Sequence, residues 1–305
     1  MTRKLGISSF FLKLIAIITM TIDHIGFLLE LLADGELEIL QLSEIFRGIG
    51  RLSMPLFIFM VVEGMIHSKN VNRYFLRLGI IASIISITYM VLEYSSLRSH
   101  VVGLLRSGNT FLDLLVVAFA IWAIKQKDNR KKLFILLPIA LSLTSFFVKG
   151  NEMAISSSIE TIHWFPCFIT MRYDWYSLLL GLLFYFSYLF ADQYIKFMQE
   201  RTSMDKEMWM MNGSYRTLVN IVSAFTLFIG TLVYYLSYYM WPEGSFINDK
   251  AASMQLLAFI SGAFILLYNG KRGYNAKWFQ YGAYLYYPLH IVILVVIYIV
   301  INGGI

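Results

Sequence analysis

Eight ionisable side chains lie inside otherwise apolar stretches of the sequence, where they could carry proton or charge chemistry. A charged residue at the centre of a membrane-spanning helix costs about 2.5–3.5 kcal/mol on insertion scales, so each needs a partner or a function. These residues are Asp23, His24, Arg47, Arg51, Glu63, Asp113, Asp174 and His290.

Asp23 and His24 are consecutive, so on a helix they point about 100° apart and Asp23 cannot orient His24 directly. Arg47 and Arg51 are four residues apart and share one face of the next apolar segment. We therefore expect an ion pair between Asp23 and these arginines, which leaves His24 to titrate. An unperturbed pKa near 6.5 suits a general base or a proton relay. The alternative is an ion pair that only locks two helices together.

His290 follows Tyr286-Tyr287-Pro288-Leu289 within the last apolar run. A proline inside a membrane helix frees a backbone carbonyl and kinks the helix. At a depth similar to that of His24, His290 could reach the same cavity. The three tyrosines Tyr284, Tyr286 and Tyr287 could also belong to an interfacial aromatic belt, although they lie somewhat deep for one.

The remaining acids have structural alternatives of equal weight. Glu63 lies near the inner end of its apolar run, and snorkelling to the interface or pairing with Lys69 is as good an interpretation as catalysis. Asp113 and Asp174 lie at the starts of apolar runs, where an acid stabilises the helix dipole or caps the helix.

The composition indicates the class of protein and the kind of secondary structure that position these residues. The chain has 305 residues, of which 58% are hydrophobic and 14% charged, with a mean hydropathy of +0.65. Soluble domains are roughly 45–50% apolar and about 25% charged. The apolar runs are continuous, unlike the alternating segments of about ten residues in membrane barrels. The sequence therefore predicts an all-α polytopic membrane protein. A lone Cys167 and five scattered histidines predict no metal site.

We expect nine membrane-spanning helices and a single membrane domain over residues 1–305. The segment 155–170 is a candidate re-entrant or interfacial piece, and a tenth helix there would invert everything after it. The expected spans are 11–32, 46–67, 74–93, 110–124, 133–148, 174–195, 215–240, 253–268 and 281–301.

The basic residues predict the orientation. With the N-terminus in the cytoplasm, the inner segments carry 18 Lys and Arg residues and the outer ones five. This bias favours a cytoplasmic N-terminus and an external C-terminus. It also accounts for the net charge of +6, so we expect the lipid bilayer as a partner and no nucleic acid.

Several motifs together resemble the TraX family. They cover the first 80 and the last 40 residues, whereas the middle contributes only Asp174-Trp175-Tyr176 and Gly181. The motifs are the run 14–26 that contains Asp23-His24, the run 47–57 from Arg47 to Phe57, Val62-Glu63-Gly64, Tyr268-Asn269-Gly270-Lys271-Arg272-Gly273 and Tyr287-Pro288-Leu289-His290.

The resemblance implies an integral acetyltransferase of a bacterial inner membrane, because the named family member acetylates the N-terminus of F pilin. Acetyl-CoA would bind from the cytoplasm, and a peptide, glycan or lipid-linked acceptor would arrive from outside or from the bilayer. The segment 149–172 departs most from the family pattern, so the acceptor is open.

Acetyl transfer from a thioester needs a base for the acceptor and a donor for the oxyanion. His24 is the expected base or transient acetyl carrier. Asp23, Arg47 and Arg51 would fix it, His290 would handle a second proton or the oxyanion, and Glu63 completes the candidate catalytic set.

The expected coenzyme A contacts are Asn269, Lys271, Arg272 and Tyr274, with Gly270 and Gly273 allowing close backbone approach. The positive-inside rule alone would also explain Lys271 and Arg272. Two other functions are open. One is a proton-coupled transporter or flippase that uses the same buried charges and a site near Pro288. The other is a non-catalytic assembly or anchoring protein.

Overall fold

The computed structural model is built from α-helices and describes residues 6–95, 108–154, 166–202, 206–211, 213–240 and 249–301. Within these residues, seven helices are long and apolar enough to cross a membrane. Two shorter apolar helices, Thr110–Ile124 and Ala252–Leu266, stand at two further predicted spans. The all-α polytopic fold is therefore confirmed. Most of the candidate tenth segment lies outside the described residues, and its end forms a short 3-10 turn, η2 (Cys167–Ile169).

The chain divides into two compact units. The first comprises Met1–Phe57, Phe186–Thr231 and Ser253–Ile305, and the second Ile58–Tyr185 and Leu232–Ala252. The expectation of one functional membrane domain stays a prediction. All members of the candidate catalytic set and of the expected coenzyme A contacts except Glu63 belong to the first unit.

The first unit is formed by α1 (Ser9–Leu32), α2 (Leu37–Gly50), α10 (Lys206–Met211), η4 (Leu256–Phe259), α13 (Ile260–Leu266) and α14 (Lys277–Ile301). It also takes the start of α3 (Ser53–His67), the end of α9 (Asp174–Gln199) and the start of α11 (Ser214–Met240). The second unit holds the rest of these three helices with α4 (Val71–Glu93), α6 (Thr110–Ile124), α7 (Asn129–Lys132), η1 (Leu133–Ile135) and α8 (Leu136–Ala154). Helix α12 (Asp249–Gln255) is divided between the units, because the second unit ends at Ala252 and the first resumes at Ser253.

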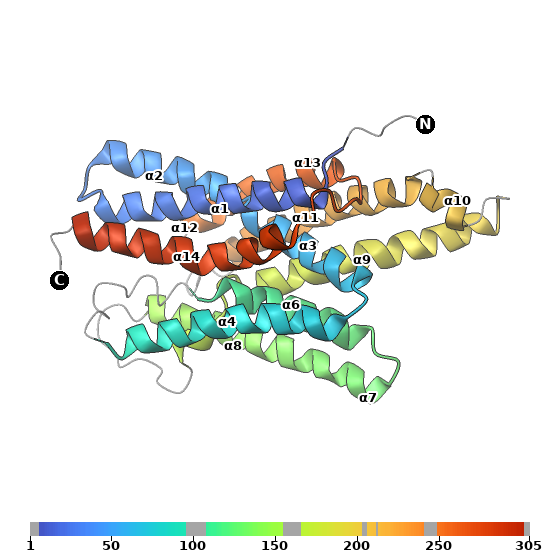
Figure 1. Ribbon diagram of the computed structural model, residues 1–305, viewed down its shortest axis with the longest axis horizontal. Coiled ribbons are helices and arrows are strands. Elements are labelled where there is room, and N and C mark those ends of the chain that lie inside the picture. The colour runs from blue at the N-terminus through green and yellow to red at the C-terminus, as the bar shows by residue number, and fades with distance from the viewer. Residues whose placement is uncertain are drawn as a thin grey trace. The chain divides into compact units, whose positions relative to one another are not determined.

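Helices α1 and α2 form an antiparallel hairpin (Figure 1). The chain reverses at Asp34 and Gly35, which both have positive φ angles, of 40° and 87°. The second span thus becomes helical at Leu37 rather than at residue 46, because Glu38 and Glu44 are exposed on the helix surface and do not interrupt it. A turn at Arg51 and Leu52 separates α2 from α3.

The N-terminal segment binds the loop between α13 and α14. The backbone N–H of Ile7 donates to the carbonyl of Leu267 at 2.9 Å, and that of Ser9 donates to Lys271 at 2.8 Å. Helices α1 and α14 therefore begin at one level, and further contacts halfway along show that they run in the same direction. First and last spans with the same direction fit an odd number of spans.

In the second unit, Asp113 is fully buried and caps the N-terminus of α9. Its carboxylate accepts hydrogen bonds from the backbone N–H of Arg172 at 2.7 Å and of Tyr173 at 3.0 Å, and from Ser177 Oγ at 2.6 Å. An acid here stabilises the N-terminus of the neighbouring helix rather than of its own. The structural interpretation of Asp113 is thus supported, with the capped helix being α9 instead of α6. Asn109 caps α6 by accepting from the N–H groups of Phe111 and Leu112.

Candidate active site

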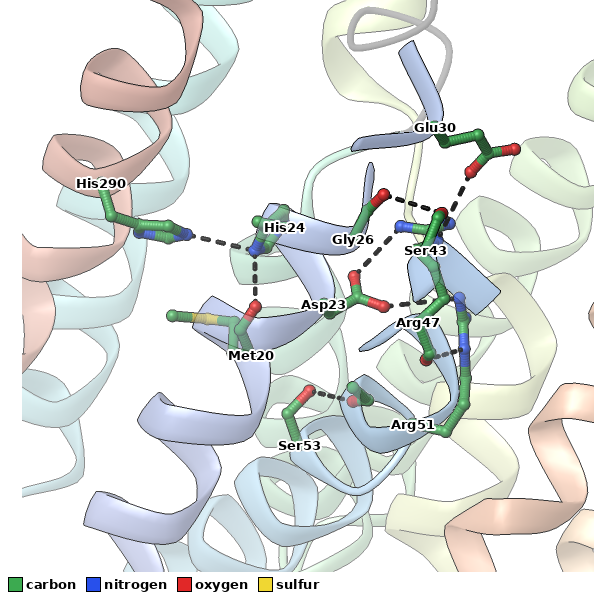
Figure 2. Close-up of polar contacts among 11 residues, drawn as sticks. Met20, Asp23, His24, Gly26, Glu30, Ser43, Arg47, Arg51, Ser53 and His290 are labelled. Atoms are coloured by element: carbon green, nitrogen blue, oxygen red, sulfur yellow. Dashed lines mark hydrogen bonds and ion pairs between the residues drawn. The ribbon is translucent and has the colours of Figure 1, made fainter. Parts of the chain in front are cut away.

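The buried carboxylate of Asp23 pairs with both predicted arginines (Figure 2). Arg47 Nη1 lies 3.2 Å from Asp23 Oδ2, and Arg51 Nη2 lies 3.5 Å from Asp23 Oδ1. Arg47 Nε also approaches Glu30 at 3.8 Å, and Arg51 Nε donates to the Arg47 carbonyl at 3.2 Å. The ion pair expected between the first two spans is confirmed.

Small residues let α1 and α2 approach closely enough for this pair. Gly50 lies directly against Asp23, so a side chain at position 50 would overlap the aspartate. Gly26 lies against the backbone of Ser43 and Arg47, and Ser43 Oγ donates to the Gly26 carbonyl at 2.8 Å. Close helix contacts of this kind depend on small residues.

On the other side of α1, the imidazole of His24 faces His290 of α14 (Figure 2). His290 Nε2 lies 3.1 Å from His24 Nδ1, and the two ring centroids are 4.9 Å apart. His290 is buried, whereas His24 is partly exposed. The structure thus brings together two residues separated by 266 positions.

The backbone carbonyls assign the tautomers of both rings. His24 Nδ1 is 2.9 Å from the Met20 carbonyl, and His290 Nδ1 is 2.9 Å from the Tyr286 carbonyl. A carbonyl oxygen only accepts, so both Nδ1 atoms carry hydrogens. The single Nδ1–H of His24 is then shared between the Met20 carbonyl and the lone pair of His290 Nε2. In the neutral ring, the lone pair of His24 resides on Nε2.

Two tyrosines of α14 hold the histidine pair. The Tyr286 ring stacks on His290 at 5.1 Å with an interplanar angle of 9°, and the edge of Tyr287 packs against His290 at 5.5 Å. Thr21 Oγ1 donates to the Ile17 carbonyl, so it accepts from the Tyr286 hydroxyl at 2.8 Å. This bond ties α14 to α1 one turn from the histidines.

Sequence reasoning missed the supporting roles of Thr21, Met20 and the tyrosines. The available signal was spacing, because Met20 and Tyr286 each precede a histidine by four residues and so present a carbonyl to its ring. The Thr21–Tyr286 contact joins distant segments and had no local signal.

Glu63 belongs to the second unit, whereas the residues described above belong to the first. Its carboxylate lies 3.6 Å from His67 Nδ1, a contact that the sequence did not suggest in place of Lys69. A catalytic role for Glu63 stays a prediction.

The four predicted coenzyme A residues lie at the loop that joins α13 to α14. Asn269 has a structural role, since its Nδ2 donates to the Gly6 carbonyl at 2.9 Å and its Oδ1 accepts from the Lys271 N–H at 2.9 Å. Lys271 and Arg272 are exposed, and Tyr274 Oη accepts from Trp278 Nε1 at 2.9 Å. The two cations are therefore accessible to a phosphate, whereas the Asn269 amide is already engaged.

A metal has no evident ligand set here. In the parts of the chain that the structure describes, no three His, Cys, Asp or Glu side chains converge as metal ligands. Independently of this, two imidazoles in hydrogen-bond contact can take part in proton transfer.

Comparison with known families agrees with this arrangement. The family model for the TraX protein matches residues 8–298. The chain belongs to the TraX family. The match includes both histidines and both arginines, so the site just described lies within the family region.

One relative of this TraX family member is a protein described as "Probable fimbrial assembly protein FimC, serogroup H1" from Dichelobacter nodosus. The two are 32% identical over 174 residues, which is 54% of this chain and 66% of the relative. The chain thus matches slightly less than two thirds of that relative. No solved structure matches this TraX family member.

Proposed function

We propose that this TraX family protein is an integral membrane acetyltransferase that moves an acetyl group from cytoplasmic acetyl-CoA to an amine or hydroxyl acceptor. The observation that carries the proposal is the hydrogen bond of 3.1 Å between His24 Nδ1 and His290 Nε2. It aligns His24 as a base whose second nitrogen holds a lone pair.

The reaction follows from the tautomers. His24 Nε2 takes the proton of the acceptor amine or hydroxyl, whose lone pair then attacks the thioester carbonyl carbon. His24 becomes an imidazolium, and its Nδ1–H donates more strongly to His290 Nε2. When the carbon–sulfur bond breaks, His24 returns the proton to the leaving thiolate. His290 thus holds the tautomer and orientation of His24, as the third residue of a catalytic triad does, through a neutral acceptor instead of a carboxylate.

This arrangement favours one of the two roles expected for His290. Its Nδ1 donates to the Tyr286 carbonyl and its Nε2 accepts from His24, so both nitrogens are engaged within the pair. Support of the proton on His24 is thus the better role for His290 than an oxyanion donor.

The Asp23 ion pair would position the base rather than react. Asp23 and His24 lie on different sides of α1 (Figure 2), so the aspartate fixes α1 against α2 while the histidine faces α14. Helix α1 is held from both sides, which restricts its rotation. Preorganisation of this kind is needed for a base to meet its substrate.

The relative from Dichelobacter nodosus supports a pilus-related acceptor. Its printed name gives it a part in fimbrial assembly. We propose a subunit of a surface appendage as the first acceptor to test, with glycan and lipid-linked acceptors as alternatives.

The test is to incubate the purified protein with acetyl-CoA and measure release of free thiol, with and without candidate acceptors. Acceptor-dependent thiol release is expected. Substrate-linked proton flux into vesicles without thiol release would contradict the enzyme and support a proton-coupled transporter.

A further inference from the structure

One face of α11 carries buried polar groups that the acetyl-transfer site does not use. Arg216, Asn220 and Ser223 follow at intervals of four and three residues, so they lie on one side of the helix. Asn220 is 2% exposed and Ser223 is 0% exposed. Asn220 Nδ2 donates to the Tyr268 carbonyl at 2.6 Å.

Two atoms of this face are unsatisfied. Among the described residues, Asn220 Oδ1 and Ser223 Oγ have no hydrogen-bond partner, although both are buried. Buried polar atoms in proteins are almost always paired, with protein groups, water or a ligand. Asn220 Oδ1 can accept from an N–H and Ser223 Oγ can donate to a carbonyl, so the two atoms can bind the amide groups of a ligand.

Arg216 lies at the same face, nearer the helix start. Its Nη1 donates to the Tyr188 hydroxyl at 2.9 Å, and its guanidinium lies 5.0 Å from the centre of the Tyr268 ring. Gly270, with a φ of +73°, passes so close that an added Cβ would lie 3.0 Å from Arg216 Nε. Arg216 is thus held beneath the glycine turn that carries Lys271 and Arg272.

The face leads from this turn toward the ion pair that positions α1. Ser223 lies seven residues, roughly 10 Å, along α11 from Arg216. The next residue, Ala224, packs against Gly262 of α13. Ser261 of α13 in turn donates to the Leu52 carbonyl at 2.9 Å, beside Arg51 of the ion pair.

We propose that this face binds acetyl-CoA. Arg216, with Lys271 and Arg272, binds the phosphates, and Asn220 and Ser223 bind the amide groups of the pantetheine arm. The inference rests on the proposed function and names where its co-substrate binds. This places the phosphates at the turn, the amides about 10 Å further along α11 and the thioester beyond them. The same order of groups occurs along coenzyme A. Guanidinium groups form strong charge-assisted bonds to phosphate.

The test compares binding of coenzyme A with binding of pantetheine, which has the amides but no phosphate. Ser223→Ala removes a hydroxyl that has no partner among the described residues, so stability should not fall. Its dissociation constants for both ligands should rise by roughly three- to tenfold, the value of one hydrogen bond. The matched control is Ser142→Ala on α8, which removes an equally buried and unsatisfied hydroxyl in the second unit. This control should bind as the unmodified protein does.

Arg216→Gln separates the two halves of the site. Coenzyme A should bind at least about tenfold more weakly, whereas pantetheine binding should not change, because only the charge-assisted bonds to phosphate are lost. Folding is checked by the melting temperature, and the Ser223→Ala result stands independently if this variant unfolds.

Different failures have different meanings. If the unmodified protein binds neither ligand, both the proposed function and this inference are overturned. If it binds coenzyme A and Ser223→Ala matches Ser142→Ala, this inference alone is overturned, and the α11 hydroxyl serves packing or holds water.

Discussion

The two histidines are not equivalent. His24 Nδ1–H donates and His290 Nε2 accepts, because each Nδ1 also faces a carbonyl one turn back. In the proposed reaction, His24 would therefore supply the reactive nitrogen, and His290 would support the charge that forms on it. The adjacent residue Asp23 points to a different side of α1 and pairs with the arginines of α2.

Substitution of His290 tests this division of roles. In His290→Gln, an amide oxygen can still accept from His24 Nδ1–H, whereas His290→Leu removes the acceptor. We expect the Leu variant to lose acetyl transfer by on the order of a hundredfold or more and the Gln variant to lose less. The measurement is the rate of thiol release at equal amounts of membrane-inserted protein. Equal rates for both variants and the unmodified protein would remove His290 from the mechanism.

The Asp23 ion pair predicts a stability effect. Asp23→Asn removes the carboxylate that Arg47 and Arg51 share, and breaking a buried pair in this way costs about 3–5 kcal/mol. A large fall in melting temperature is the expected result.

Joint replacement of the ion pair provides the control. Asp23→Leu with Arg47→Met and Arg51→Met leaves no buried charge in the pair and should recover much of the stability. If the triple variant also keeps full transfer, the ion pair has no part in positioning the base.

At the scale of elements, α1 is the helix on which the site depends. It contacts α2 through Asp23 and Gly26, and α14 through Thr21 and His24. Its first residues are hydrogen-bonded to the loop before α14. The proposed base, His24, therefore lies where two helix pairs meet, roughly 22 Å along α1 from Ser9.

The close contact of α1 with α2 predicts a difference between two glycines. Gly50→Ala should lower stability by about 1–3 kcal/mol, because the added methyl overlaps Asp23. Gly282→Ala on α14 meets nothing within 4 Å and should be neutral or slightly stabilising. Melting temperatures in the same detergent check both, and an equal shift for the two would contradict the described packing.

The sequence predicted the helices better than their junctions. Long apolar runs define spans by themselves, since each must cross the bilayer. The start of α2 was placed nine residues late, because Glu38 and Glu44 suggest a loop although they lie on the exposed helix surface. The α1–α14 pairing was inferred only from the similar depth of His24 and His290.

The contacts of the site could be predicted where a buried charge requires a partner of opposite charge. They could not be predicted where the packing of distant segments determines which groups meet. A buried Asp23 needs a cation, and Arg47 with Arg51 was the nearest source. No such rule predicts the hydrogen bond of Asn269 to Gly6 or that of Asp113 to the start of α9, because these bonds join segments that only the fold brings together.

For the whole molecule, the parallel course of α1 and α14 predicts opposite locations for the two chain ends. With the basic residues inside, a C-terminal reporter should be active only outside the cytoplasm. The control is a reporter fused at the loop around residue 127, which should be cytoplasmic. A cytoplasmic C-terminal reporter would mean that the number of spans is even.

The central claim is that His24 is the base of an acetyl transfer inside the membrane. The most direct test is transfer of labelled acetyl from acetyl-CoA to acceptor by the unmodified protein and by His24→Ala, both reconstituted in vesicles. The account predicts transfer by the unmodified protein and a loss of roughly 10²–10⁴-fold in the variant, with normal insertion and melting temperature. Undiminished transfer by His24→Ala would contradict it.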